Sequence, residues 1–139
     1  TVSNKEIREA LKESHILGYP SIWPETSCMV LMESMSAGLV CVHSNYAALY
    51  ETAANWTQMY QLNEDSAIHA GSFYNMLDAS ITNYNDPIMQ SVLAPMRSYT
   101  NVFYAWQGRV NQWNALLTSL INSVEDRSVP KETFNYKVG

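Results

Sequence analysis

The first part of the chain contains two uninterrupted segments that are bounded by residues typical of helix starts or ends. The first covers residues 5–13, and Thr1 or Ser3 stands where a capping side chain is needed. The second runs over residues 28–37 without a helix-breaking residue and reaches Gly38, a common C-terminal stop. The pattern therefore predicts two helices in this part of the chain.

Strands are predicted between and after these helical segments, over residues 15–19, 39–43 and 59–62. The run at 39–43 is short, branched and apolar, which indicates a buried strand. Strands that alternate with helices across short joints indicate parallel βαβ units with right-handed connections. The small residues at 44–52 are expected to form a loop that lets the backbone approach a ligand.

The remainder of the chain has a helical pattern. A helix is predicted from the polar entry at 63–65 to about Leu77, and residues 86–122 are expected to be helical, with Pro87 near one start and Pro95 interrupting the helix or opening a turn. One face of the last helix is apolar; its residues are Phe103, Trp106, Val110, Trp113, Leu117 and Leu120. A short edge strand is possible over 133–138. The expected fold class is α/β, with about three parallel strands, flanking helices and a helical C-terminal section.

Composition limits the possible functions. The chain has 139 residues, with 13 acidic against 8 basic side chains and a net charge of -5, which disfavours a nonspecific nucleic-acid binder. No apolar run approaches the ~20 residues of a transmembrane segment, and no signal peptide is visible. Cys28 and Cys41 are too few for a disulfide framework, so reduced thiols and a cytoplasmic location are expected.

Two carboxylates, Glu25 and Glu33, stand eight positions apart around the predicted start of the second helix. A helix start presents backbone N–H groups and a positive dipole end, which favour a phosphate, and Thr26 or Ser27 is expected to cap it. A carboxylate on the second turn is placed to accept hydrogen bonds from ribose hydroxyls. The alternative is that both glutamates are ordinary solvated helix charges.

The residues around this pair resemble those of a known family. Tyr19–Cys28, followed by Glu33–Gly38, is similar to the donor-binding half of GT-B glycosyltransferases, especially the retaining family 4 group with its Pro-Ser turn, Glu-x7-Glu motif and Ala-Gly helix end. Ala48–Thr52 resembles the loop that follows in that family, and Tyr104–Gln107 with Trp113 resembles its closing aromatic helix. The resemblance covers about residues 4–121 and implies a partial Rossmann-like fold.

The resemblance also implies a function. It implies sugar transfer from a nucleotide diphosphate sugar, with retention of configuration and with no metal or other cofactor. Glu33 would bind the ribose hydroxyls, and Glu25 would act at the donor sugar near its reacting end. The backbone amides of Thr26, Ser27 and Cys28 would hold the distal phosphate and stabilise the leaving group.

The same resemblance implies that the chain is catalytically incomplete. The whole family fold needs two Rossmann-like domains, so residues 1–127 are expected to form a partial donor-binding domain and 128–139 a tail. The family's Arg/Lys pair lies upstream of this region, and no Lys or Arg stands between Lys12 and Arg97. The expected partner is a missing N-terminal domain or a second copy in a homodimer. The alternative function is a non-catalytic nucleotide-binding or oligomerising module, and a phosphorylase or epimerase on the same scaffold is less favoured.

Histidines offer a weaker chemical signal. His43 shares a predicted strand with Cys41, and Cys28 follows a neighbouring strand, but three candidate ligands without a close pair are poor zinc spacing. His15 and His69 are expected to be structural or to face solvent. None of the three is expected to take the catalytic role of the family's histidine, which belongs to the other domain.

Overall fold

The computed structural model of the protein describes residues 2–125, and it describes side chains for residues 2–123. The chain divides into two compact units, of which the first ends at Phe103 and the second begins at Tyr104. The elements of the first unit are α1 (Asn4–Glu13), β1 (Ile16–Tyr19), α2 (Met29–Ala37), β2 (Val40–Ser44), α3 (Ala48–Ala53), β3 (Gln58–Tyr60), α4 (Ser66–Thr82) and α5 (Pro87–Phe103). The second unit contains α6 (Trp106–Glu125). The boundary predicted after residue 127 and the strand predicted over 133–138 lie outside the described residues.

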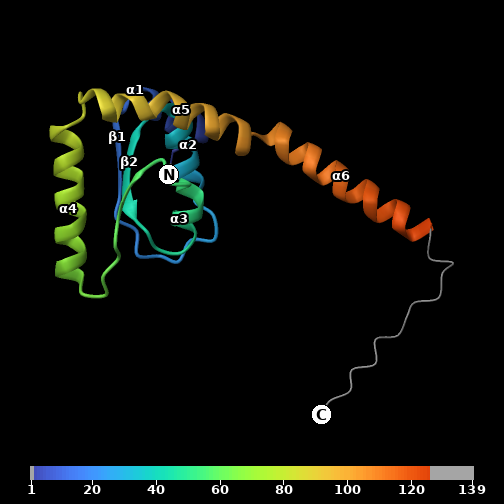
Figure 1. Ribbon diagram of the computed structural model, residues 1–139, viewed down its shortest axis with the longest axis horizontal. Coiled ribbons are helices and arrows are strands. Elements are labelled where there is room, and N and C mark those ends of the chain that lie inside the picture. Colours follow the sequence, from blue (N-terminus) through green and yellow to red (C-terminus); the bar gives the residue numbers. More distant parts are fainter. Residues whose placement is uncertain (1, 126–139) are drawn as a thin grey trace, which may run out of the picture. The chain divides into compact units, whose positions relative to one another are not determined.

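The three strands form one parallel sheet in the order β1-β2-β3. Ile16 pairs with Val40 at the start of the β1–β2 ladder, and Val42 pairs with Gln58 where β3 joins. The strands are parallel because a helix follows each of the first two strands. That helix carries the chain back to the end of the sheet where the next strand begins (Figure 1). The predicted α/β class, with about three parallel strands, flanking helices and a helical C-terminal section, is confirmed.

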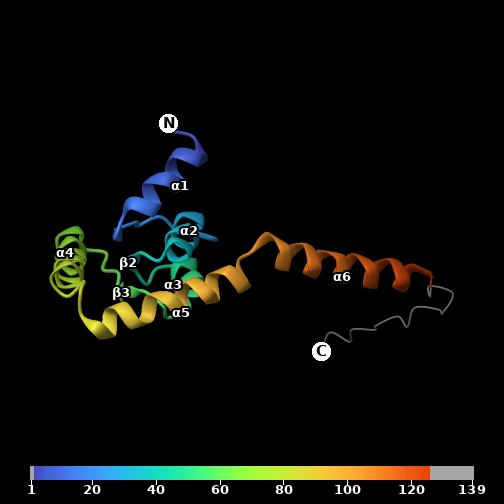
Figure 2. The ribbon, with the colours of Figure 1, turned by 90° about the horizontal axis from the view of Figure 1, so that it is seen from above.

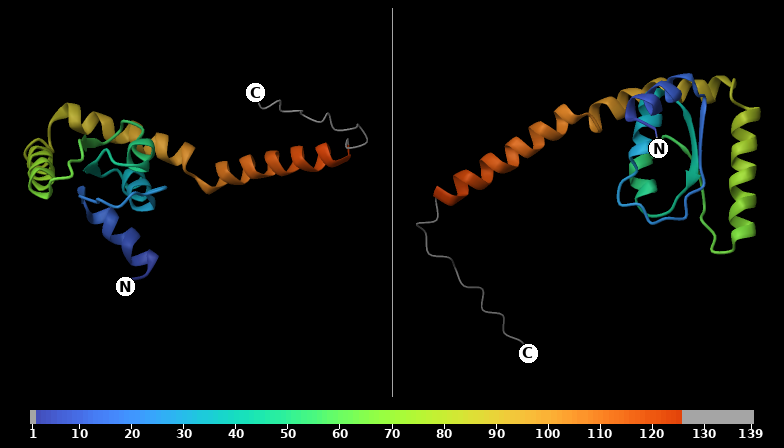
Figure 3. Two further views of the ribbon diagram at one scale, coloured as in Figure 1. Left: turned by 90° about the horizontal axis from the view of Figure 1, so that it is seen from below. Right: turned by 180° about the vertical axis from the view of Figure 1, so that it is seen from behind.

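Helices cover both faces of this sheet. α4 packs on β2 and β3 on one face, and α2 and α3 pack against β2 on the other (Figures 1 and 2). The strands separate α4 from α2 and α3 in both views of Figure 3. α5 packs along α2, and α1 also packs against α2. All five residues of β2 are buried, which explains why its sequence is a continuous run rather than an alternation.

The hydrophobic core lies between the sheet and the α2 side. Its buried members are Cys28, Leu31, Met35, Leu39, Cys41, Leu49, Ala53 and Met96. Three of them come from α2 or its cap and one, Met96, from α5, so α2 is held from the sheet and from α5 at once. This packing fixes where α2 starts and ends.

The end of α2 is formed by Gly38, as its sequence predicted. Gly38 adopts a left-handed conformation with φ +88°, and its N–H donates to the carbonyls of Ser34 and Met35. The next amide, Leu39 N–H, donates to Ser34 as well, which completes the cap before β2 begins. The side chain of Arg97, from α5, lies directly over this glycine.

Three expectations about the helices were wrong. Pro95 neither interrupts α5 nor opens a turn: it lies inside the helix, which continues because Met96 and Thr100 are buried beyond it. The segment expected to be a loop at 44–52 contains α3, whose start has no side-chain cap to signal it. The last helix was expected to carry Phe103 on its apolar face, but Phe103 ends α5, and α6 begins at Trp106.

The second unit presents an apolar face along α6. The side chains of Trp106, Val110, Trp113, Leu117 and Leu120, which we call the α6 stripe, are each at least 46% exposed. The helix itself forms as its sequence pattern predicted.

Replacing Gly38 with alanine is expected to destabilise the fold. The left-handed backbone costs a non-glycine residue roughly 1–2 kcal/mol, and the new Cβ would lie 2.7 Å from Cδ of Arg97. Gly71→Ala is the matched control: Gly71 lies in α4 with nothing near its Cβ position, so alanine there should stabilise by about 0.5–1 kcal/mol. Urea unfolding curves measure both, and equal effects of the two substitutions would contradict this explanation of Gly38.

Candidate functional site

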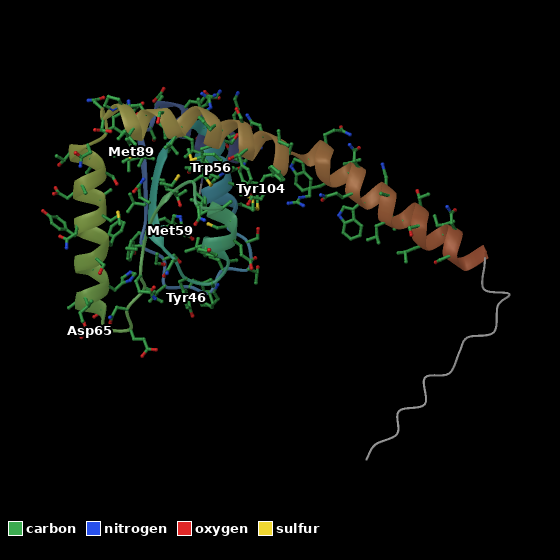
Figure 4. The ribbon with its side chains drawn as sticks, in the orientation of Figure 1. Tyr46, Trp56, Met59, Asp65, Met89 and Tyr104 are labelled. Carbon is green, nitrogen blue, oxygen red and sulfur yellow. The ribbon has the colours of Figure 1, made fainter. Side chains whose placement is uncertain are left out.

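The predicted site residues gather at the carboxyl edge of the sheet. The loop after β1 carries Glu25 and leads to α2, and the loop after β2 leads to α3. Figure 4 shows Tyr46 and Asp65, which follow β2 and β3, at this same edge, toward which the strand arrows point. In open parallel sheets, ligands bind at this edge, where helix starts and loops converge.

Glu25 is fixed from two directions. Its Oε1 accepts a hydrogen bond from the Tyr19 hydroxyl at 2.7 Å, and its backbone carbonyl accepts from Ala48 N–H at the start of α3. The hydrogen bond to Glu25 and partial burial raise the pKa of Tyr19 to about 12, so Tyr19 is a neutral donor at physiological pH. The carboxylate is therefore held in one orientation at the end of β1.

Tyr19 was not among the predicted site residues. It is the last residue of β1 and pairs with His43 of β2 in the sheet. A tyrosine at the carboxyl end of a parallel strand, six residues before a motif glutamate, was the available signal. Its hydroxyl is a hydrogen-bond donor, whereas ionised glutamates can only accept hydrogen bonds.

The start of α2 has no side-chain cap. Thr26 and Ser27, which were expected to provide one, are exposed and lie before the helix, whose N-cap residue is Cys28. Since Met32 N–H is the first to bond within the helix, to the Cys28 carbonyl, the amides of the first turn are those of Met29, Val30 and Leu31. The phosphate-binding amides predicted at Thr26, Ser27 and Cys28 thus stand just before the amides that the helix start supplies.

Cys28 itself is buried under this helix start. Burial raises the pKa of its thiol, while the amides of Leu31 and Val30, which face the sulfur, act in the opposite direction. A neutral thiol is only a weak hydrogen-bond acceptor, so it leaves the positive end of α2 largely uncompensated.

Glu33 lies on the second turn of α2, as the spacing predicted. It is half-buried, and its Oε1 lies 3.5 Å from Nδ2 of Asn4 at the start of α1. The structure therefore brings Glu25 together with Tyr19 and Cys28, whereas Glu33 faces α1 one turn further along.

A cavity of about 400 Å³ opens at the same edge, on the α4 side of the sheet. Its apolar walls are Pro20, Ile22, Ala70 and Phe73, and its polar walls are Asn63, Glu64, Ser66 and His69. His69 was expected to be structural or to face solvent; it is only 8% exposed and contacts Tyr60 and Pro20. The cavity was missed because its walls come from segments that are far apart in the sequence.

The start of α4 differs from that of α2 because a side chain caps it. The Asp65 carboxylate accepts hydrogen bonds from the amides of Ala67 and Ile68 at 2.8 and 3.2 Å. A negative charge thus already occupies this helix start.

His43 is a core residue with both ring nitrogens bonded. Its Nδ1–H donates to the Ser44 carbonyl at 2.8 Å, so Nε2 accepts from the Thr57 hydroxyl at 2.7 Å. Burial lowers the pKa of His43, with the Ser44 hydrogen bond opposing. Across the described part of the chain, no group of three His, Cys, Asp or Glu side chains is placed to hold a metal ion.

Comparison with known proteins gives a match to a family model. Residues 1–70, half of the chain, match the family model described as glycosyl transferases group 1. No curated protein and no solved structure matches the chain. None of the helices within residues 2–125 is long and apolar enough to cross a membrane.

The Tyr19–Glu25 contact predicts a loss of stability at alkaline pH. A tyrosine whose pKa is raised to about 12 in the fold and lies near 10 when unfolded contributes stability below about pH 10 that is lost as the pH rises toward 12. Tyr19→Phe cannot ionise, so its free energy of unfolding should fall less between about pH 8 and pH 11 than that of the unchanged chain. Tyr74→Phe, at an exposed position of α4, is the control. The same pH dependence for Tyr19→Phe and the unchanged chain would refute the contact.

Proposed function

The chain belongs to the glycosyl transferases group 1 family, and we propose that it is the donor-binding part of a retaining GT-B enzyme that takes a nucleotide diphosphate sugar. The observation that carries the proposal is the uncapped start of α2, which lies between two glutamates at the carboxyl edge of the sheet. Membership of the family supports glycosyl transfer in general. The arrangement of the α2 start and the two glutamates supports binding of a nucleotide diphosphate sugar.

The start of α2 is the phosphate site. Its first-turn amides have no side-chain acceptor other than a buried thiol, and the aligned peptide dipoles place partial positive charge there. The start of α4 is unsuited to the same role because Asp65 fills it. The phosphates of the donor thus lie at α2, where developing negative charge on the leaving group is stabilised.

The two glutamates hold the ends of the donor. Glu33, one turn along α2, accepts hydrogen bonds from the ribose hydroxyls, which replace its long contact with Asn4. Glu25 lies before the phosphate site and meets the sugar near its reacting carbon. The Tyr19 hydroxyl fixes the Glu25 carboxylate, which keeps one oxygen directed at the donor.

The chain alone does not complete the reaction. Arg97 is the first basic residue after Lys12, and its side chain packs over Gly38 at the carboxyl end of α2. A nine-residue helix is about 13 Å long at 1.5 Å per residue, so Arg97 lies at the wrong end to neutralise the phosphates. An additional domain must supply cations and the acceptor site.

The alternative is a non-catalytic module that oligomerises. It is favoured by the α6 stripe, whose side chains repeat at alternating spacings of four and three, the heptad pattern of a coiled coil. Only Arg109 and Glu125 are charged along α6, so two copies of the helix do not repel each other. Within the described residues β1 pairs only with β2, which leaves a second surface for a homodimer contact.

Loss of the Glu33 charge is expected to weaken nucleotide binding. Glu33→Gln should raise the Kd for UDP or GDP by roughly 10- to 150-fold, the equivalent of about 1.5–3 kcal/mol for a hydrogen bond to a charged group. Glu13→Gln removes the same charge from the exposed end of α1 and should leave the Kd unchanged. Calorimetric titration measures the Kd of the unchanged chain and of both variants. Equal affinities, or no binding to the unchanged chain at millimolar nucleotide, would remove the ribose role.

Self-association through the α6 stripe is expected to give a dimer of the 15.7 kDa chain. Trp113→Glu places a charge in the stripe and should return the mass to that of one chain. Ser119→Glu adds the same charge to the opposite face of α6 and should leave the dimer intact. Light scattering at micromolar concentration decides between these outcomes. A single-chain mass for the unchanged protein would show that it does not dimerise.

A further inference from the structure

The cavity on the α4 side of the sheet has the size and lining of a small-molecule site. Its volume of about 400 Å³ lies within the range of ligand pockets, about 300–1,000 Å³. It lies between Pro20, immediately after β1, and the first turns of α4, so the loop after β1 separates it from the start of α2. It is a second site at the same edge, distinct from the phosphate site.

His69 gives this cavity an unsatisfied hydrogen-bond acceptor. Its Nε2 lies 3.4 Å from the Pro20 carbonyl and 3.5 Å from the Tyr60 hydroxyl. In the tautomer that donates to the Pro20 carbonyl, Nε2 carries the proton and Nδ1 is left with a lone pair. Nδ1 is buried and has no hydrogen-bond partner, although a buried acceptor without one is costly. A ligand hydroxyl that reaches Nδ1 through a small rotation of the ring would remove that cost.

The charges around the cavity disfavour an anionic ligand. Glu64 is the one charged side chain in its lining, and it is negative. The adjacent start of α4 is neutralised by Asp65, which takes the amides of Ala67 and Ile68. A phosphate or carboxylate would therefore meet negative charge and find no helix-start amides, whereas Glu64 and Asn63 can accept hydrogen bonds from hydroxyls.

The apolar walls favour a ring with a C–H face. Phe73 is held between β1 and Tyr60: its Cζ is 3.1 Å from the Cβ position of Gly18, and its ring centroid is 6.0 Å from that of Tyr60. Gly18 is the residue that lets the ring lie this close to the strand. Together with Pro20 and Ile22, the Phe73 side chain forms the apolar part of the cavity lining.

We propose that this cavity binds a neutral, hydroxylated ring ligand of the monosaccharide class. The ring's C–H face packs on Phe73 and Ile22, one hydroxyl donates to Nδ1 of His69, and others donate to Glu64. This site does not depend on the nucleotide-binding role of α2, Glu25 and Glu33.

The test uses the full 139-residue chain and methyl glucoside as the neutral probe. NMR titration up to about 50 mM should shift the ring resonances of His69 and Phe73, as expected for a millimolar Kd. Glucose 1-phosphate, which carries a phosphate on the same ring, should bind at least tenfold more weakly at these resonances because of Glu64. The absence of shifts with methyl glucoside, or tighter binding of the phosphate at this cavity, would overturn the proposal.

Three variants locate the site. Ala70→Leu fills the cavity from an exposed helical position and should weaken methyl glucoside binding at least tenfold, whereas Ala79→Leu, the same change further along α4, should not. His69→Gln keeps a donor for Pro20 but lacks the Nδ1 acceptor and should weaken binding about five- to tenfold. UDP affinity should be unchanged in Ala70→Leu, so failure here is distinguishable from failure of the nucleotide site. Equal sugar binding by Ala70→Leu and Ala79→Leu would contradict the assignment.

Discussion

The first turn of α2 begins with backbone amides that meet no side-chain acceptor other than the buried Cys28 thiol, and the first unit holds this turn in place at the carboxyl edge of the sheet. Leu31 and Met35 bury one side of α2 against the sheet, and Met96 of α5 joins the same core. Gly38 ends the helix in a left-handed conformation, from which the chain turns directly into β2. Because both ends of α2 are fixed in this way, the phosphate site that we propose at its start would be preorganised before a phosphate binds.

The two helix starts at this edge differ in one carboxylate, and that difference divides the edge into two chemical environments. Asp65 occupies the amides of α4, so the α4 side carries negative charge and an apolar cavity. Cys28 offers α2 only a buried thiol, so the α2 side keeps its positive end. Glu25, held by Tyr19, stands in the loop that connects the two sides. A charged donor and a neutral ring would thus be sorted by electrostatics before any shape selection.

The sequence predicted the features that depend on local pattern. β2 was predictable because a parallel strand covered on both faces is a continuous apolar run, and Gly38 because a left-handed helix end strongly favours glycine. The positions of Glu25 and Glu33 relative to α2 followed from the same pattern. Features that depend on contacts between distant segments were not predictable: Pro95 is tolerated through burial of Met96 and Thr100, Tyr19 acts through a residue in the next loop, and His69 is buried by Pro20 and Tyr60. Thr26 and Ser27 had the right side chains for a cap, but core packing of Cys28 starts the helix after them.

The measurement that tests the role of α2 most directly is an NMR titration of the isotope-labelled chain with UDP, in which each backbone amide is followed. An uncapped α2 start predicts the largest shift changes at Met29, Val30 and Leu31 and none at Ala67 and Ile68, whose amides Asp65 already occupies. Shifts of similar size at both helix starts, or shifts confined to α4, would contradict the assignment of the phosphate site to α2.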